Sequence, residues 1–327
     1  MASTVKTTNE GVTATLAPAI RPGSVQAWAV AARPRSLWVA VSPVLVGAAL
    51  GYERTGRIDP VAALLVLAAA LLMQVVTNMQ NDVGYTVRGG ERSGTRTGLP
   101  RATANGWLSV RDVRGGIVAV SLLGAAIGLA LAAYRGWPVL AIGSASLLAA
   151  LAYMGGPRPI AYTPFGELTV FVFFGLVAVT GTDWVLTGSV GTTSLLAAVA
   201  IGGLAAAALA VNNHRDIAHD RLVGRRTFAV LVGERGSLAL YTALLFGPFA
   251  LLPAMALSAG APGLLLPVAL LPTAWRLRRD FRLCPRGTAF NAVLFRSFKL
   301  ELAFAALLSA GALAGPLLHT FAGLLGR

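Results

Sequence analysis

Two short polar clusters interrupt the apolar stretches of this chain, and both combine carboxylates, amides and arginines. The first contains Asn78, Asn81 and Asp82, and it continues to Glu91 and Arg92. A charged carboxylate at the end of a membrane helix is costly, so acids in such a place indicate function. Carboxylate and amide oxygens are the ligands that Mg²⁺ prefers. One arginine can bind two phosphate oxygens through two parallel hydrogen bonds. The cluster therefore predicts a divalent metal that holds a phosphorylated substrate.

The second cluster follows a later apolar stretch and holds the same kinds of side chain: Asn212, Asn213, Arg215, Asp216, Asp220 and Arg221. A step of four residues turns a helical side chain by only about 40°. The spacing therefore places Asn212, Asp216 and Asp220 on one helix face. The alternative is that these acids cap helices or pair with neighbouring arginines. The shared spacing and the existence of a partner cluster favour a functional site.

The rest of the chain provides the membrane helices that must position these clusters. Of its 327 residues, 56% are hydrophobic and only 12% are charged, and the mean hydropathy is +0.70. Soluble domains carry roughly 25% charged residues, so the composition excludes an ordinary soluble domain. The single cysteine, Cys284, cannot form an internal disulfide.

Apolar stretches long enough to cross about 30 Å of hydrocarbon predict an all-α, polytopic membrane bundle of about nine transmembrane helices. The predicted spans are 36–53, 60–84, 115–134, 138–155, 165–188, 193–213, 236–258, 261–276 and 299–323. The stretch 261–276 is short and contains three prolines, which predicts a kink. Counts of eight or ten spans are also compatible with the pattern.

The basic residues give the predicted orientation. The net charge is +14, and all but four of the 27 lysines and arginines fall on one side of the nine-span arrangement. The positive-inside rule then places the N-terminus and both clusters in the cytoplasm. Arginines confined to loops between apolar spans argue against nucleic-acid binding. Residues 1–24 are rich in Thr, Ala and Pro and are expected to form a disordered tail, followed by one membrane domain over residues 25–327.

The motifs together resemble the UbiA family of intramembrane aromatic prenyltransferases, and within it the branch that prenylates 1,4-dihydroxy-2-naphthoate in menaquinone biosynthesis. The resemblance runs from about residue 27 to the end. Its specific parts are the segments 32–37, 78–91, 153–159, 166–167, 173–182 and 212–227. Members of this family carry two acid motifs, after the second and the sixth helix of a nine-helix bundle.

The resemblance implies that Mg²⁺ is held by Asp82, Glu91, Asp216 and Asp220, which are also the expected catalytic residues. One position departs from the family pattern. The first motif usually has a second Asp three residues after the Asp that corresponds to Asp82, and here that place is taken by Tyr85. The departure is compatible with a weaker metal site, with a shift of the metal to other ligands, or with a subfamily that uses another acceptor.

The expected diphosphate-binding residues are Asn78, Asn81, Arg88, Arg92, Asn212, Asn213, Arg215 and Arg221. Acceptor contacts are expected from Tyr153, Arg158 and Glu167. Tyr153 is equally compatible with core packing. Glu167 is equally compatible with a first-turn acid favoured by the helix dipole.

The function implied is transfer of a polyprenyl chain from polyprenyl diphosphate to an aromatic acceptor, with 1,4-dihydroxy-2-naphthoate expected first. The expected partners are these two substrates and the lipid bilayer of the cell (inner) membrane, without a protein partner. Alternatives are 4-hydroxybenzoate or another phenol as acceptor, a transporter, or a non-catalytic homologue. Transporter sites usually lie near the membrane midplane, whereas both clusters are predicted at helix ends, which favours the enzyme.

Overall fold

The computed structural model describes residues 20–90, 97–285 and 287–325, with side chains up to residue 315. Within these ranges the regular structure is entirely helical. The elements are α1 (Val25–Ala32), η1 (Pro34–Ser36), α2 (Trp38–Thr55), α3 (Pro60–Val87), α4 (Val110–Arg135), α5 (Trp137–Met154), η2 (Ile160–Tyr162), α6 (Gly166–Val170), η3 (Phe171–Val177), α7 (Ala178–Thr187), α8 (Thr192–Arg215), α9 (Ile217–Leu222), α10 (Phe228–Ala259), η4 (Pro262–Leu270), α11 (Leu271–Leu283) and α12 (Phe290–Leu325).

Local sequence signals fix where the long helices begin and end. Asp59 caps α3 by accepting hydrogen bonds from the backbone nitrogens of Val61 and Ala62, and Ser109 and Thr227 cap α4 and α10 in the same way. A capping side chain satisfies donors that the first helical turn leaves unpaired. Gly56 ends α2 with a φ of 65°, a conformation that glycine adopts at little cost.

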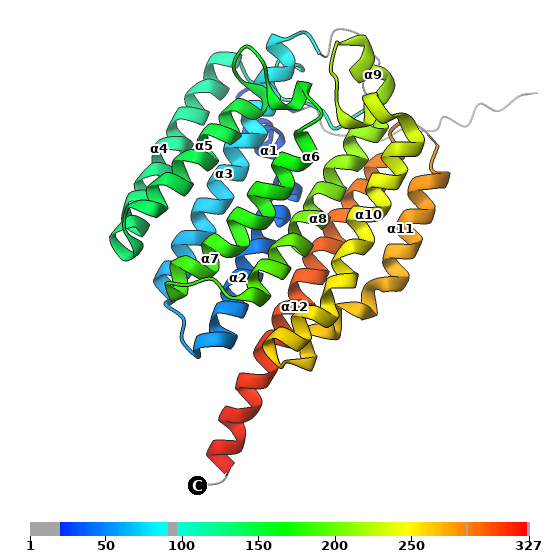
Figure 1. The fold of residues 1–327 in the computed structure, drawn as a ribbon. Helices are drawn as coiled ribbons and strands as arrows, with labels where there is room; N and C mark the ends of the chain where they lie inside the picture. The colour runs from blue at the N-terminus through cyan, green and yellow to red at the C-terminus, as the bar shows by residue number, and fades with distance from the viewer. Residues whose placement is uncertain (1–19, 91–96, 286, 326–327) are drawn as a thin grey trace, which may run out of the picture.

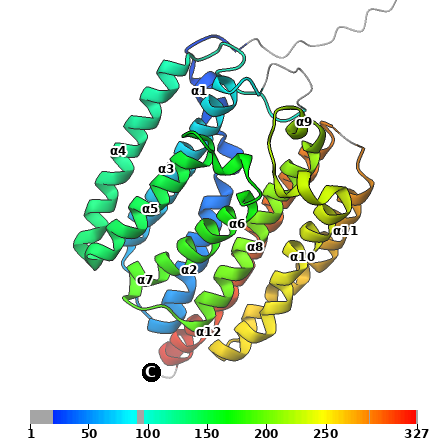
Figure 2. The ribbon, with the colours of Figure 1, turned by 45° about the horizontal axis from the view of Figure 1, so that its top comes forward.

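The helices form a bundle in which α8 is central. Figures 1 and 2 show α3, α4 and α5 on one side, α10 and α11 on the other, and α8 between them. Helix α8 packs against α10, α12 and η3, while α2 packs against α7 and α12. Most of the α8 side chains are buried, in agreement with its small, apolar sequence.

The number of spans differs from the predicted nine. Seven helical segments among the described residues are long and apolar enough to cross a membrane, and the bent pair formed by residues 25–36 and 38–55 makes eight. The predicted span 261–276 is not among them. It forms η4 and the beginning of α11, and α11 becomes strongly basic before it ends at Leu283. The fold class is confirmed, but the count of nine and the side of the N-terminus are not.

The backbones of α8 and η3 touch at a crossing made by two glycines. A Cβ atom added to Gly175 would lie 2.4 Å from the carbonyl oxygen of Ala198 and 2.5 Å from the Cα atom of Gly202. Only glycine permits this approach. The crossing lies where η3 adopts a π-helix, a local form that is frequent at functional sites.

Both polar clusters lie at the same end of the bundle. The C-terminal ends of α3, α5 and α8 gather there, together with α9, at the top of Figure 1. The segment before α1 belongs to this end, because the backbone nitrogen of Gly23 donates to the carbonyl oxygen of Trp107 at 2.8 Å. Residues 20–24 are thus part of the folded domain, whereas residues 1–19 of the expected tail lie outside the described residues.

Candidate active site

A cavity of about 610 Å³ runs through the centre of the bundle, lined by residues of α1–α8 and α12. Along α3 its wall extends from Val66 to Asn81, which is about 22 Å at 1.5 Å per residue. At the Asn81 end the lining is polar: Arg33, Arg35, Ser36, Gln74, Asn78, Asn81, Asn212 and Arg215. The rest of the lining is almost entirely apolar. The shape fits a long apolar molecule with a charged head.

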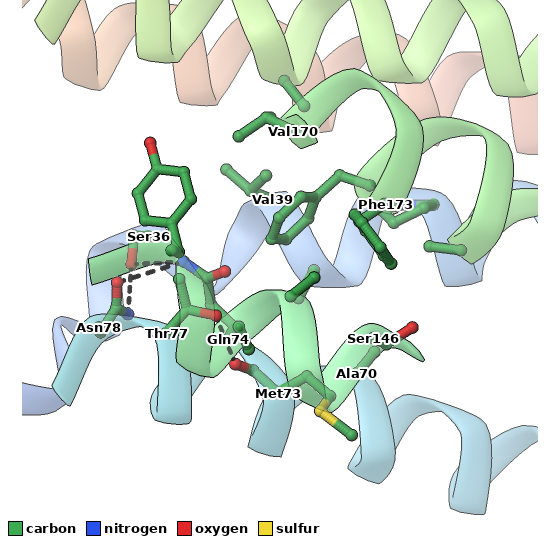
Figure 3. Close-up of a pocket in the computed structure, with 18 of the residues that line it drawn as sticks. Ser36, Val39, Ala70, Met73, Gln74, Thr77, Asn78, Ser146, Val170 and Phe173 are labelled. Atoms are coloured by element: carbon green, nitrogen blue, oxygen red, sulfur yellow. Dashed lines mark hydrogen bonds between the residues drawn. The ribbon is translucent and has the colours of Figure 1, made fainter. Parts of the chain in front are cut away.

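The first cluster contributes amides rather than acids to this polar end. The Nδ2 atom of Asn78 donates to the carbonyl oxygen of Ala32 at 2.8 Å and to the hydroxyl of Ser36 at 2.9 Å. Gln74, one turn earlier, donates to the same hydroxyl at 3.2 Å. Figure 3 shows these side chains side by side on the cavity wall. They join α3 to the turn between α1 and α2.

Asp82 does not line the cavity. Its fully buried carboxylate accepts hydrogen bonds from the backbone nitrogens of Ala102 and Thr103, both at 2.8 Å, and from the Thr103 hydroxyl at 2.5 Å. Both oxygens therefore hold the turn that follows the first cluster. In this structure Asp82 therefore positions the loop between α3 and α4, and its expected role as a metal ligand stays a prediction.

The second cluster keeps its predicted spacing. The backbone nitrogen of Asp216 donates to Asn212, and that of Asp220 donates to Asp216, so the period of four persists across the end of α8. The Arg215 guanidinium binds the Asp216 carboxylate through two hydrogen bonds, at 2.8 and 2.7 Å. Arg215 also donates to the Oδ1 atom of Asn291 on α12, at 2.5 Å. Arg215 and Asn212 line the cavity, and their role in binding the diphosphate stays a prediction.

Asp220 forms a buried ion pair with Arg225, at 2.6 Å between Oδ1 and Nη1. The same nitrogen donates to the hydroxyl of Tyr85, and the other guanidinium nitrogens donate to the carbonyl oxygen of Ala161 at 3.0 and 2.9 Å. Arg225 thus joins α3, η2 and α9. Burial raises the pKa of Asp220 to about 6, although the guanidinium of Arg225 acts in the opposite direction.

Tyr85 fills the place of the family's second acid and lies between two arginines. The Arg101 guanidinium carbon is 3.7 Å from the centre of the Tyr85 ring, and that of Arg225 is 5.2 Å away. A guanidinium above an aromatic ring is attracted by the ring's electron density. The family pattern places a carboxylate at this position. Here the Tyr85 ring takes that place and binds the two arginines through cation–π contacts.

Glu167 and Tyr153 lie close to the second cluster. The Oε1 atom of Glu167 accepts a hydrogen bond of 2.9 Å from Asn213, whereas its buried Oε2 atom has no hydrogen-bond partner among the described residues. Tyr153 lines the cavity, and Glu167 and Asn213 do not. Asn213 therefore binds a neighbouring side chain in this structure. Of the predicted acceptor contacts Tyr153, Arg158 and Glu167, Tyr153 lines the cavity and the other two do not.

Three predicted site arginines lie away from the cavity. Arg88 donates to the carbonyl oxygen of Gly156 and lies 5.4 Å from the ring centre of Tyr162. Arg221 is exposed and donates to a carbonyl oxygen of α10 at 3.4 Å, and Arg158 is also exposed. The structure does not bring these three into the cavity. Glu91 and Arg92 lie outside the described residues.

A group of three or more His, Cys, Asp or Glu side chains able to hold a metal is not found among the described residues. The second cluster nevertheless fits Mg²⁺, which usually takes one or two carboxylates and completes its shell with water and phosphate. The buried Oδ2 atom of Asp220 has no hydrogen-bond partner in the part of the chain that is described. Asp216 and Asp220 could therefore hold one ion between them.

The structure also reveals cavity residues that were not among the predicted site residues. Arg33 has a left-handed φ of 54°, a conformation found at no other non-glycine residue in the described ranges. Arg35 lies 5.1 Å from the ring centre of Phe295 on α12. Both arginines line the polar end of the cavity. In the sequence they belong to the segment 32–37, which resembles the family but was assigned no role in the site.

Comparison with known sequences identifies the family of this chain. A profile described as "UbiA prenyltransferase family" matches residues 40–300, most of the chain. The chain belongs to the UbiA prenyltransferase family. It is 34% identical over 228 residues to the 1,4-dihydroxy-2-naphthoate octaprenyltransferase of Escherichia coli (strain K12), covering 68% of this chain and 73% of the relative. It is 36% identical over 218 residues to the protein of the same name from Mycobacterium tuberculosis, covering 67% and 74%.

The family match and these relatives identify the protein as a transferase of prenyl groups. Solved structures share its fold. A UbiA homologue from Aeropyrum pernix K1 has a TM-score of 0.65 at 21% identity and covers 86% of this chain and 98% of its own. A homologue from Archaeoglobus fulgidus, bound to DMAPP and Mg²⁺, has a TM-score of 0.60 at 17% identity and covers 86% and 99%.

Proposed function

We propose that this UbiA-family protein transfers a polyprenyl chain from polyprenyl diphosphate to 1,4-dihydroxy-2-naphthoate, within the cell membrane and as a step of menaquinone biosynthesis. The proposal for the acceptor rests on the relatives named for this reaction, which are 34% and 36% identical to the chain. The acid-bearing end of the bundle is proposed to face the cytoplasm, because the loops there carry most of the basic residues.

One observation carries the proposal: the central cavity is polar at one end and apolar along the rest of its length. The diphosphate would occupy the polar end, among Arg33, Arg35 and Arg215. The isoprenoid chain would extend along α3 toward Val66. A transporter site near the middle of the bundle would need polar residues where the lining is apolar.

The reaction breaks the allylic C–O bond of the diphosphate and forms a C–C bond to an electron-rich ring carbon, and the naphthoate then loses CO₂. Arginines at the polar end stabilise the negative charge on the departing diphosphate. The apolar wall excludes water, which would otherwise capture the allylic cation. Asn78 binds Ala32 and Ser36, and it thereby fixes the position of α3 relative to the turn between α1 and α2 at the polar end.

Asp216 and Asp220 are the residues proposed to hold Mg²⁺, with Glu91 as a further ligand proposed from the sequence alone. When bound, the ion neutralises phosphate charge as a Lewis acid. Both aspartates are already paired with arginines, Arg215 and Arg225. Those arginines offset the repulsion between the two neighbouring buried carboxylates.

The test is a prenyl-transfer assay with the purified full-length protein in detergent or in vesicles. Labelled farnesyl or geranylgeranyl diphosphate is combined with 1,4-dihydroxy-2-naphthoate, 4-hydroxybenzoate and other phenols, with Mg²⁺ or with a chelator. Mass spectrometry of the products identifies the acceptor. The expected product is the decarboxylated prenyl-naphthoquinol. Transfer to 4-hydroxybenzoate alone would replace the proposed acceptor, and no transfer to any acceptor would favour a non-catalytic homologue.

A further inference from the structure

The amide of Gln74 has an unused hydrogen-bond acceptor at the cavity wall. The side chain is 8% exposed and lines the cavity. Its Nε2 atom donates to the Ser36 hydroxyl at 3.2 Å and to the Oδ1 atom of Asn78 at 3.4 Å. Its Oε1 atom is buried and has no hydrogen-bond partner among the described residues. A buried carbonyl oxygen without a partner is costly, which makes it a candidate for a ligand contact.

The orientation of this amide is fixed by backbone groups, which removes the usual uncertainty between its oxygen and nitrogen. The Ser36 hydroxyl donates to the carbonyl oxygen of Arg33 at 3.0 Å, so toward Gln74 it can only accept. Asn78 donates its amide hydrogens to the carbonyl oxygen of Ala32 and to Ser36, so its own oxygen turns toward Gln74. Two acceptors therefore face Gln74, and both require its nitrogen.

With the nitrogen held in this way, the oxygen must point in the other direction. Figure 3 shows the Gln74 oxygen turned away from Ser36 and Asn78, toward the space beside Val39 and Phe173. Val39 and Phe173 are apolar and line the same cavity. The oxygen is thus a single, rigidly oriented acceptor in apolar surroundings, next to the polar end where the diphosphate is proposed to bind.

We propose that Gln74 determines acceptor specificity by accepting a hydrogen bond from a ring hydroxyl of the aromatic substrate. This inference rests on the proposed function, because it assumes an aromatic acceptor in the cavity. A hydroxyl is the matching group: it donates a proton to Oε1, and its flat, apolar ring packs against Val39 and Phe173. An ionised carboxylate has no proton to donate, and the partial negative charge on the amide oxygen would repel it.

A site built to bind a hydroxyl rejects an analogue that lacks the proton, because its own polar group is then left unpaired. The wild-type protein is therefore expected to prefer a hydroxyl-bearing acceptor over the corresponding methyl ether. A methoxy group still donates electrons to the ring, so the reactivity of the carbon is little changed. The preference reports mainly on the hydrogen bond.

The experiment compares kcat/KM for 1,4-dihydroxy-2-naphthoate and its two monomethyl ethers in the wild-type protein and in Gln74→Met, which keeps the length of the side chain but removes the amide. Gln74→Met is expected to lower kcat/KM for the hydroxyl substrate about tenfold or more, while the KM for the prenyl diphosphate changes little. The preference for hydroxyl over methoxy should fall toward one for at least one of the two ethers. Ser146→Ala is the matched control, since Ser146 lines the cavity but its hydroxyl is already bonded to the carbonyl oxygen of Ile142. That control should leave the ratio unchanged.

An unchanged ratio in Gln74→Met, in an active and folded protein, would overturn the inference and leave the proposed function standing. Absence of prenyl transfer by the wild type to any acceptor would instead remove the proposed function. If Gln74→Met does not fold, Gln74→Asn withdraws the amide by one methylene and keeps its polarity. Calorimetric binding of the acceptor and its ethers then gives the same ratio without turnover, and an unchanged binding ratio in Gln74→Asn overturns the inference too.

Discussion

The guanidinium of Arg225 donates a hydrogen bond to the hydroxyl of Tyr85, although the two residues are 140 positions apart. One belongs to the first polar cluster and the other follows the second, so this contact joins the two motifs directly. Because the same guanidinium nitrogen also binds Asp220, the residue at position 85 affects how strongly a proposed metal ligand is held by its arginine.

Tyr85→Phe is expected to keep most of the activity, because Arg225 retains its bonds to Asp220 and Ala161. Tyr85→Asp would place a second carboxylate beside Arg225, releasing Asp220 in part and adding negative charge. We therefore expect a higher apparent Mg²⁺ affinity, measured as the Mg²⁺ dependence of the rate at saturating diphosphate. Two inactive variants would show instead that the phenol itself contacts a substrate.

Arg225→Ala is expected to destabilise the protein strongly, because it leaves the Asp220 carboxylate buried without its cation. Breaking a buried ion pair typically costs about 3–5 kcal/mol. The measurement is the unfolding temperature of the purified protein in detergent. The neighbouring Arg226 is exposed, so Arg226→Ala is the control and should unfold near the wild-type temperature. Equal unfolding temperatures for both variants would show that the pair is not structural.

Asp216→Ala and Asp220→Ala are expected to abolish turnover while the protein still inserts into the membrane. Single groups that stabilise transition-state charge are often worth 10²-fold or more. The readouts are the rate of prenyl transfer and the yield of protein in the membrane fraction. Either variant retaining more than about a tenth of the wild-type rate would falsify its assignment as a metal ligand.

Asp82→Asn should affect stability rather than metal binding. An amide in place of the carboxylate would turn a donor toward the backbone nitrogen of Ala102 or Thr103, which leaves a buried N–H unpaired at a cost of about 1–3 kcal/mol. We expect a lower unfolding temperature and an unchanged apparent Mg²⁺ affinity. The opposite result, weaker Mg²⁺ binding at an unchanged unfolding temperature, would restore the role expected from the sequence.

The orientation in the membrane can be tested by cysteine labelling in a Cys284→Ser background. Cysteines at the exposed positions Leu222 and Leu283 should react from the cytoplasm, and cysteines at Arg57 and Trp137 from outside. The distribution of basic residues gives this expectation. Labelling of Leu222 and Leu283 from opposite sides would contradict both the topology and the placement of one site at one end.

The fold class and the second cluster could be predicted from the sequence because they depend on local patterns. Apolar length identifies the spans, and a period of four keeps Asn212, Asp216 and Asp220 in line. The span predicted at 261–276 is not confirmed, because this stretch is divided between the 3₁₀ helix η4 and the basic helix α11 and does not form one long apolar helix. Hydropathy alone does not show where one helix type changes to another.

Interactions between distant segments could not be predicted. The sequence shows Asp82 as an acid of the first cluster, but not that the backbone nitrogens of Ala102 and Thr103 bind both of its oxygens. Arg225 looks like one more basic loop residue, because its partners Tyr85 and Ala161 are far away in the sequence. Gln74 is a single amide in an apolar run, and only the fixed orientations of its neighbours reveal a free acceptor.

The glycine crossing between α8 and η3 has a consequence for tail length. Because Gly175 and Gly202 bring the backbones of η3 and α8 into contact, the spacing of these two helices beside the cavity is fixed. The opposite wall is different, because the cavity-lining Gly128 on α4 and Gly143 on α5 each have open space where a Cβ atom would lie. A larger side chain at Gly128 or Gly143 is therefore expected to fill part of the cavity and to favour a shorter isoprenoid, while the spacing of α8 and η3 stays the same.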